Sequence, residues 1–243
     1  MRTLIVGDIH GCLKAFKTLL RVADPGPEDR FVTLGDMIDR GPESKGVLEL
    51  LINMHSKGIL TPLRGNHEIM FMDAGKRESS KNWLENAGGR FTLMSFGIEP
   101  TKGWRNSIPL SIWRFINEAC LDVVELDQHF MVHAGVEAGL PLEDQPPSVL
   151  HWAKLEIPPV PHFSGKIMVC GHTVMPDCLP VDFGSVWGLD TGAYQDFGWL
   201  SMVELETKTV WQANQRGEMR KGILQHWTKI TKSTAIPGQH FSS

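Results

Sequence analysis

Five short polar blocks, each placed directly after a run of apolar residues, constrain this chain more than any other feature. Each block combines glycine with aspartate, histidine or asparagine, and each follows a segment expected to be a strand. The blocks are residues 7–11, 35–42, 65–68, 133–135 and 171–173. Polar side chains at the carboxyl ends of strands form the usual ligand crevice of an α/β sheet. The pattern therefore predicts an α/β fold with one polar site at a sheet edge.

The first third of the chain alternates predicted strands with predicted helices. Strands are expected over residues 3–6, 30–34 and 61–64, and helices over 13–20, 42–52 and from about residue 67. Pro42 suits the first turn of its helix because its fixed φ matches helical geometry. The order of elements implies right-handed crossovers and mostly parallel strands in this part.

The second half is rich in predicted strands. Residues 122–126 and 130–133 are expected to form a hairpin, followed by strands over 167–170, 186–189, 200–204 and 209–211. A short helical piece is expected near residues 149–155. The tail after Trp227 carries few large apolar residues, which predicts a loosely held end. We expect one domain over residues 1–243, because no linker divides the chain.

Residues 77–119 interrupt the alternation and are predicted to form a helical cap insertion. Insertions on a fixed scaffold often determine specificity, so we expect substrate selection to reside here. The insertion contains Trp83, Trp104 and Trp113. These rings either stack on a substrate or form the small core of the insertion itself, which is the ordinary role of buried aromatic residues.

Composition excludes several classes of protein. With 42% hydrophobic and 21% charged residues, the chain is not disordered throughout. No apolar run reaches the ~18–20 residues of a membrane span, and the N-terminus lacks a signal-peptide pattern. Four cysteines without a Cys-x-x-Cys pair predict a reducing, cytoplasmic location. The net charge of −4 argues against nucleic-acid binding. The sequence leaves the oligomeric state open.

The residue types in the blocks suit a metal centre. Asp8 and His10 lie two residues apart in an extended segment, so their side chains face the same way and can converge on one ion. Asp36 can bridge two cations, and three further candidates offer an amide oxygen or imidazole nitrogens: Asn66, His133 and His172. Nitrogen and oxygen ligands without thiolate suit Mn, Fe or Zn better than Ca. Any one of these residues alone has an ordinary structural explanation; their occurrence in ordered blocks does not.

Together, the five blocks resemble the phosphoprotein phosphatase family of dinuclear, calcineurin-like metallophosphoesterases. The motifs Gly-Asp-x-His-Gly, Gly-Asp-x-x-Asp-Arg-Gly, Gly-Asn-His-Glu, His-Ala-Gly and Gly-His-Thr extend from Gly7 to Thr173. The resemblance includes the bacterial and bacteriophage lambda-like serine/threonine protein phosphatases. It implies an α/β (α+β) fold, a four-layer metallophosphoesterase β-sandwich flanked by helices.

The resemblance also implies roles for individual residues. It gives two divalent ions, with Mn expected and Fe or Zn as alternatives. Their ligands would be Asp8, His10 and Asp36 for one ion, and Asp36, Asn66, His133 and His172 for the other. His67 resembles the general acid, Asp39 its orienting partner and Arg40 the phosphate-binding arginine. The implied reaction is in-line attack of a metal-bridging hydroxide on a phosphate ester, without a phosphoenzyme.

One departure from the family pattern concerns phosphate binding. Family members usually carry a second arginine between the last two histidine blocks, often as Trp-x-Arg. Here residues 134–171 contain no arginine, and the matching segment ends in Lys154. Lysine keeps the positive charge but lacks the bidentate fork of arginine. Lys154 is therefore either a weaker phosphate ligand or an ordinary solvated lysine.

The resemblance favours a serine/threonine protein phosphatase, whose substrate is a phosphorylated protein, over a symmetrical diadenosine tetraphosphatase. The latter usually carry alanine in place of Asp39 and aspartate in place of Glu68. Action on small phosphate esters stays compatible with the same site. Val174 stands where nuclease-type relatives have a further histidine, which disfavours nucleic-acid substrates. A third hypothesis is a non-catalytic, metal-containing module that binds phosphoproteins.

Replacing Lys154 with arginine tests its predicted role. A bidentate guanidinium should bind phosphate oxygens better than an ammonium group. We expect a lower KM or a higher kcat on a phosphomonoester, measured by steady-state kinetics. If both constants keep their wild-type values, Lys154 is not part of the site.

Overall fold

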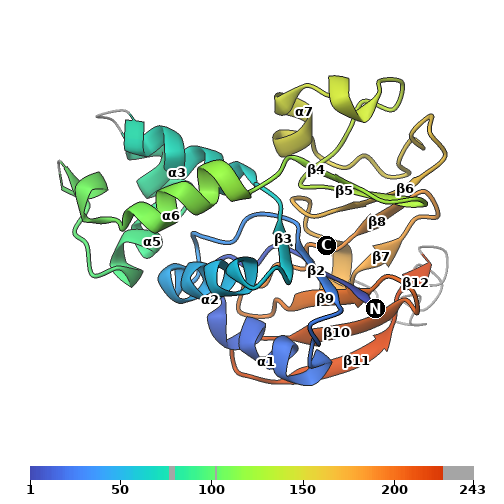
Figure 1. The fold of residues 1–243 in the computed structure, drawn as a ribbon, viewed down its shortest axis with the longest axis horizontal. Coiled ribbons are helices and arrows are strands. Elements are labelled where there is room, and N and C mark those ends of the chain that lie inside the picture. The colour runs from blue at the N-terminus through green and yellow to red at the C-terminus, as the bar shows by residue number, and fades with distance from the viewer. Residues whose placement is uncertain (77–79, 102, 227–243) are drawn as a thin grey trace, which may run out of the picture.

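The computed structural model describes residues 1–76, 80–101 and 103–226, and two mixed β-sheets form its centre (Figure 1). Among these residues, one six-stranded sheet has the order β11-β10-β9-β1-β2-β3 and the other β12-β7-β8-β6-β5-β4. The predicted loose tail from Trp227, and residues 77–79 and 102 of the predicted insertion, lie outside the described residues.

The strands are short, and each sheet combines strands from separate parts of the chain. The first sheet contains β1 (Thr3–Val6), β2 (Arg30–Thr33), β3 (Leu60–Pro62), β9 (Leu200–Glu204), β10 (Thr209–Ala213) and β11 (Met219–Ile223). The second sheet contains β4 (Val123–Glu125), β5 (His129–Val132), β6 (Ile167–Cys170), β7 (Val181–Asp182), β8 (Val186–Gly188) and β12 (Gln225–His226).

Helices cover the outer faces of the sheets, and the described residues 80–101 and 103–119 of the predicted insertion form a separate helical lobe. They are α1 (Leu13–Ala23), α2 (Ser44–Ser56), α3 (Asn66–Lys76), α4 (Lys81–Glu85), α5 (Gly89–Ser95), α6 (Leu110–Arg114) and α7 (Pro147–Trp152). Single helical turns are η1 (Trp104–Ser107), η2 (Phe115–Ala119), η3 (Leu142–Asp144) and η4 (Pro176–Cys178). None of the described helices has both the length and the apolar character needed to cross a bilayer.

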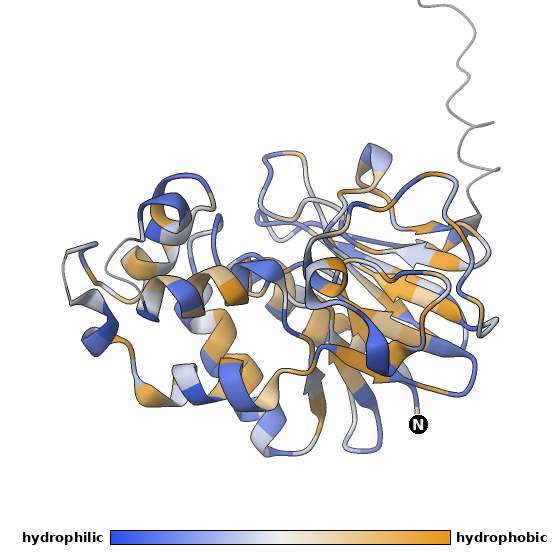
Figure 2. Cartoon of the chain, turned by 90° about the horizontal axis from the view of Figure 1, so that it is seen from above, coloured by the Kyte–Doolittle hydropathy of each residue, from blue (hydrophilic) through white to orange (hydrophobic). Residues whose placement is uncertain are grey.

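Alternation along the strands builds the layers. In β1, Leu4 and Val6 pack against the helices, whereas Ile5 faces the second sheet. In β5, Met131 faces the first sheet, and its neighbour Phe130 packs on the outer side with α7. Both faces of these strands are therefore buried, which gives the predicted α/β sandwich. Figure 2 shows hydrophobic residues along the strands and hydrophilic residues on the peripheral loops.

Most predicted elements are present, with differences at their ends. Strands β1, β2 and β3 are parallel, and β4 and β5 form the predicted antiparallel hairpin. Helix α2 begins at Ser44, so Pro42 precedes the helix instead of opening it. The sequence did not predict β7, β11 or β12. Strand β11 is largely exposed, and its pairing with β10, rather than an alternating apolar pattern, defines it.

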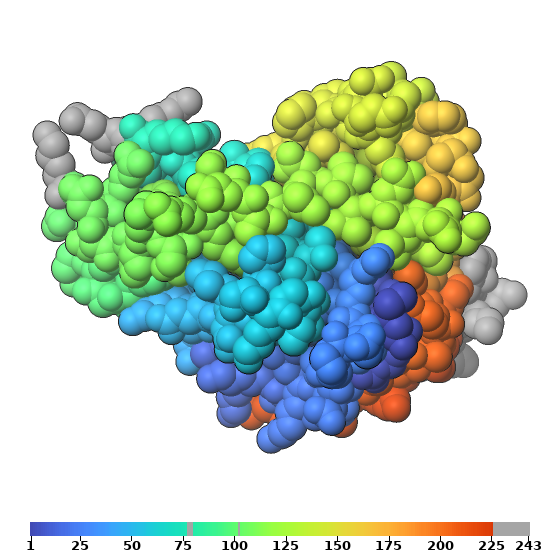
Figure 3. Space-filling model, in the orientation of Figure 1, coloured from blue at the N-terminus to red at the C-terminus, as the bar shows by residue number. Residues whose placement is uncertain are grey.

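The described part of the predicted insertion is helical and has an aromatic core. Trp83 and Trp104 are 3% and 7% exposed, so they do not form an open stacking surface. Trp113 stacks on Phe71 of α3 with a centroid distance of 4.4 Å. These tryptophans therefore join the helical lobe to α3. In the space-filling view, a notch in the outline separates this lobe from the segment that contains α7 (Figure 3).

Candidate active site and metal centre

The five polar blocks meet at one end of the two sheets. Parallel strands β1, β2 and β3 bring the first three blocks to the same edge, and parallel strands β5 and β6 do so for the last two. Backbone hydrogen bonds then join neighbouring blocks, such as His10 N to Asp36 O at 2.8 Å and Gly171 N to His133 O at 2.8 Å. The loops therefore form one continuous surface built from both sheets.

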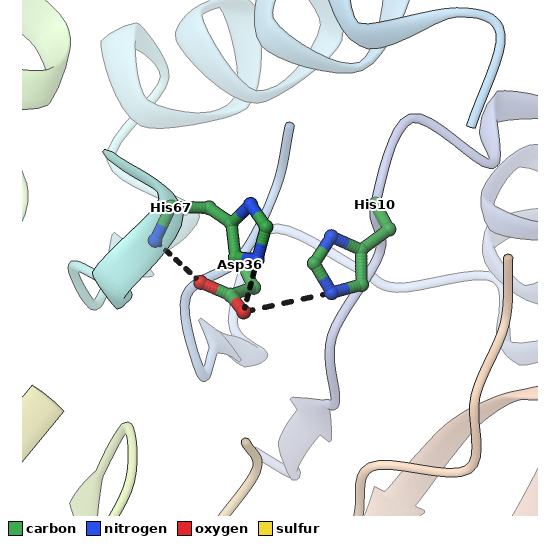
Figure 4. Close-up of side chains that lie close together, drawn as sticks. All are labelled: His10, Asp36 and His67. Atoms are coloured by element: carbon green, nitrogen blue, oxygen red, sulfur yellow. Dashed lines mark hydrogen bonds and ion pairs between the residues drawn. The ribbon is translucent and has the colours of Figure 1, made fainter. Parts of the chain in front are cut away.

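Asp36 lies at the centre of this surface. Its carboxylate oxygens are 3.5 Å from Nε2 of both His10 and His133, and 3.9 Å from Nε2 of His67. The backbone N–H of His67 also donates to Asp36 Oδ1 at 3.0 Å (Figure 4). A Cβ atom on Gly65 would overlap this carboxylate, so glycine is required there. Asp36, in the second block, thus contacts groups from three of the other four blocks.

His10 and His133 turn their Nε2 atoms toward Asp36. His10 Nδ1 contacts Ile38 O, and His133 Nδ1 contacts Leu34 O, both at 2.8 Å. In each case the backbone carbonyl accepts a hydrogen bond from Nδ1–H, so the lone pair of Nε2 faces the centre of the site. Burial lowers the pKa of both rings below its ordinary value. Neutral imidazole is the form that binds metal ions.

Asn66 completes a second group of ligand atoms. Its side-chain oxygen lies 3.0 Å from His133 Nε2 and 3.2 Å from both His172 Nδ1 and the Asp36 carboxylate oxygens. Burial, together with the nearby His133, lowers the pKa of His172 to about 4. All the atoms around the Asn66 oxygen are hydrogen-bond acceptors. They therefore need either the NH2 group of the Asn66 amide turned toward them or a cation. The donor set therefore fits a divalent ion.

Two triads of ligand atoms share the Asp36 carboxylate. One consists of His10, Asp36 and His67, and the other of Asp36, His133 and His172; within each triad the atoms lie within 4.8 Å of one another. Burial acts to raise the pKa of Asp36, but His133, His67 and His10 together hold it below its ordinary value. An ionised carboxylate between two groups of imidazoles is the geometry expected of a bridging ligand.

Asp8 belongs to neither triad, although it was predicted as a ligand. Its carboxylate accepts the backbone N–H of His172, at 3.0 Å to Oδ2. Burial and the charges of Asp190 and Asp36 raise its pKa well above the ordinary value. Asp8 therefore lies beside Asp36 in a region of concentrated negative charge, which a cation would stabilise.

His67 and Asp39 form a buried pair. His67 Nδ1 donates to Asp39 Oδ2 at 2.7 Å, and both side chains are at most 1% exposed. Burial acts to lower the pKa of His67, but the charges of Asp36 and Asp39 and the hydrogen bond to Asp39 raise it. The protonated imidazolium, the form that can act as a general acid, is thus favoured.

The two predicted phosphate-binding residues lie at the rim of the site. Arg40 donates from Nη1 to His10 Nε2 at 3.1 Å, and its guanidinium stacks on the Tyr194 ring at 4.5 Å. Lys154 donates to His172 O over a longer distance of 3.4 Å. The site therefore has one cation near each triad, and both stay close to solvent.

Glu68 has a role that the sequence analysis did not identify. It is fully buried, and its carboxylate accepts the backbone N–H groups of Asp36, Met37 and Gly65 at 2.8–2.9 Å. Burial and the charge of Asp36 raise the pKa of Glu68 to about 7. Glu68 thereby ties the second block to the third. A signal was available, because glutamate at the third helical position often accepts the N-cap N–H group.

Backbone strain is concentrated at the site. Of nine described non-glycine residues with positive φ, five are predicted site residues: His10, Asp36, Asp39, Arg40 and His172. Such conformations cost about 1–3 kcal/mol each and persist where the surroundings enforce them. Aspartate and histidine adopt the left-handed region more often than other residues with a side chain, but residue type alone does not show which of them will do so.

A profile described as calcineurin-like phosphoesterase matches residues 1–209. The chain therefore belongs to the calcineurin-like phosphoesterase family, which uses a dinuclear metal site, and the predicted family and fold class are confirmed.

Named relatives match parts of the chain. Serine/threonine-protein phosphatase 1 of Salmonella typhimurium is 44% identical over 92 residues, 37% of this chain and 41% of that protein. A symmetrical bis(5′-nucleosyl)-tetraphosphatase of Acidovorax sp. is 33% identical over 143 residues, 56% of this chain and 44% of that protein. The matches thus span about two-fifths of these relatives' length.

A solved structure resembles nearly the whole chain. It is a cold-active protein-tyrosine phosphatase of a psychrophilic Shewanella species, with a TM-score of 0.60 and 15% identity. The match covers 92% of this chain and 80% of that one. At this identity the likeness concerns the fold alone.

Glu68→Gln should weaken metal binding by about 10–100-fold, the usual effect of losing an outer partner of the ligands. Glutamine has one acceptor oxygen and would turn an NH2 group toward backbone N–H donors, which separates the second block from the third. Calorimetric titration with Mn²⁺ measures the affinity. The control is Glu49→Gln, an exposed residue of α2. Equal affinities for Glu68→Gln and the wild type would contradict this role.

Proposed function

We propose that this protein is a dinuclear-metal phosphomonoesterase that removes phosphate from phosphoserine and phosphothreonine in proteins. The observation that carries the proposal is the position of Asp36, which the two triads share, together with the pairing of His67, a member of the first triad, with Asp39. A hydrolase that acts on phosphate esters needs charge stabilisation, a phosphate anchor and a proton donor. The chain has residues for each of these tasks.

The proposed division of labour follows from the residue types. The ligands would be Asp8, His10, Asp36, Asn66, His133 and His172. When bound, two divalent ions, with Mn as our choice, would polarise phosphoryl oxygens and acidify the attacking water. The guanidinium fork of Arg40 would bind phosphate oxygens, with Lys154 adding positive charge from the other side. His67 would then donate its Nε2 proton to the leaving oxygen, while Asp39 keeps the Nδ1 proton in place.

Two classes of substrate are compatible with this site: phosphorylated proteins and dinucleoside tetraphosphates. Similarity to a serine/threonine-protein phosphatase supports the first, and the longer match to a symmetrical bis(5′-nucleosyl)-tetraphosphatase supports the second. We favour the protein phosphatase because the tetraphosphatases that the sequence resembles usually lack the Asp39 carboxylate, which here contacts His67 directly. We also propose a cytoplasmic location, because all four cysteines are buried free thiols.

His67→Asn should reduce kcat on a phosphoseryl peptide by about 10²–10⁴-fold, because the leaving alkoxide loses its proton donor. Metal content, measured by elemental analysis, should stay at the wild-type level. His55→Asn, on α2 with its own hydrogen bond to Leu60 O, serves as the control. Wild-type turnover in His67→Asn would remove His67 from the mechanism.

A comparison of substrates tests the proposed class. With Mn present, kcat/KM on a phosphoseryl peptide should exceed that on diadenosine tetraphosphate by about tenfold or more, a difference of ~1.4 kcal/mol. Phosphotyrosyl peptide and p-nitrophenyl phosphate complete the set. A preference for the dinucleotide would establish the tetraphosphatase instead. Stoichiometric metal with no turnover of any substrate would indicate the non-catalytic binding module.

A further inference from the structure

The helical lobe reaches the His67–Asp39 pair directly. Trp83, on α4, donates from Nε1 to Asp39 Oδ2 at 2.8 Å. Thr92, on α5, donates from Oγ1 to Asp39 Oδ1 at 2.6 Å. With the bond from His67, the Asp39 carboxylate therefore accepts three hydrogen bonds, two of them from this lobe.

These contacts are shielded from water. Asp39 and Thr92 are 0% exposed and Trp83 is 3% exposed. A buried carboxylate without such donors would lose its hydration without compensation. Trp83 and Thr92 therefore stand where water would otherwise bind, and they leave Asp39 one fixed direction in which to meet the imidazole of His67.

Trp83 also fixes the distance between the two halves of the pair. His67 lies at the start of α3, and Phe71 lies four residues later, on the same face of that helix. The ring of Trp83 packs edge-on against Phe71, with centroids 5.5 Å apart, while its N–H group binds Asp39. One indole thus contacts both the helix that carries His67 and the loop that carries Asp39.

Thr92 and its neighbours hold the strained backbone of that loop. Asp39 and Arg40 both have positive φ, 70° and 66°. The backbone N–H of Asp39 contacts Thr92 Oγ1 at 3.0 Å and Ser44 Oγ at 3.1 Å. The N–H group of Arg40 points to Gly88 O, at the start of α5, over 3.4 Å. Helix α5 is therefore the support against which this left-handed turn is formed.

We propose that Trp83 and Thr92 are positioning residues that align Asp39 and, through it, the proton donor His67. The inference rests on the proposed function, in which His67 protonates the leaving group. It assigns to the helical lobe a part in the chemistry, in addition to the expected part in substrate selection. Neither residue touches the substrate; each acts through the carboxylate of Asp39.

The test compares two aryl phosphates that differ in their need for a proton. Phenolate is a poor leaving group, with a conjugate acid of pKa about 10, whereas p-nitrophenolate leaves readily without protonation. Trp83→Phe removes the indole N–H group but keeps an aromatic ring at this position. Thr92→Val keeps the shape of the side chain and removes the hydroxyl, which both donates to the Asp39 carboxylate and accepts the Asp39 backbone N–H. We expect kcat on phenyl phosphate to fall by about tenfold or more, and by a clearly smaller factor on p-nitrophenyl phosphate.

Matched controls separate positioning from packing. Trp104→Phe changes a second buried tryptophan of the same cluster, whose ring lies 5.2 Å from that of Trp83. Thr18→Val removes a hydroxyl that donates to Lys14 O within α1. Both controls should keep the wild-type ratio of the two rates. An equal loss on both substrates in Trp83→Phe and Thr92→Val would mean a purely structural role and would overturn the proposal.

A double-mutant cycle with His67→Asn completes the test. If Trp83 acts through the proton donor, Trp83→Phe should cause no further loss on phenyl phosphate once His67 is asparagine. The same loss in both backgrounds would overturn the inference. If His67→Asn itself leaves phenyl phosphate turnover unchanged, the proposed role of His67 has failed. The two failures are therefore distinguishable.

Discussion

The burial of Asp36 between loops from both sheets is the constraint on which the rest of the site depends. A carboxylate removed from water must be compensated by positive charge or by hydrogen-bond donors. Here the backbone N–H of His67 donates to it, whereas His10 and His133 turn unprotonated Nε2 atoms toward it, so a cation between these groups would supply the remaining compensation. Glu68, another buried acid, adds negative charge but also holds the loop that carries Asp36. This concentration of buried acid fits a site that binds cations.

The same loops are held in conformations that an isolated chain would avoid. Left-handed backbone at His10, Asp36 and His172 turns each side chain toward the common centre. The two sheets supply the rigidity that makes this possible, because both faces of their central strands are packed against other residues. Preorganisation of this kind lowers the free energy needed to assemble a site when ligands bind.

The helical lobe contributes to stability and to the site through the same residues. Its tryptophans pack on α3, and one of them also binds the Asp39 carboxylate. Packing and positioning are thus combined in a single side chain. This arrangement couples the orientation of the proton donor to the position of the lobe. A shift of α4 or α5 would move Asp39 and thereby change the orientation of the His67 ring.

The sequence by itself determined the strands with apolar alternation, the parallel order of β1 to β3 and the gathering of the five blocks at one edge, because these follow from patterns local to the chain. It missed β11, which lacks an apolar pattern and exists through pairing with β10. Only the tertiary structure decided which donors meet Asp39, since Trp83 and Thr92 lie 44 and 53 residues away in the chain. It also decided that the carboxylate of Asp8 faces the backbone of His172 rather than joining either triad. Hydrogen bonds over such separations depend on how helices and loops pack, and no short-range pattern records that packing.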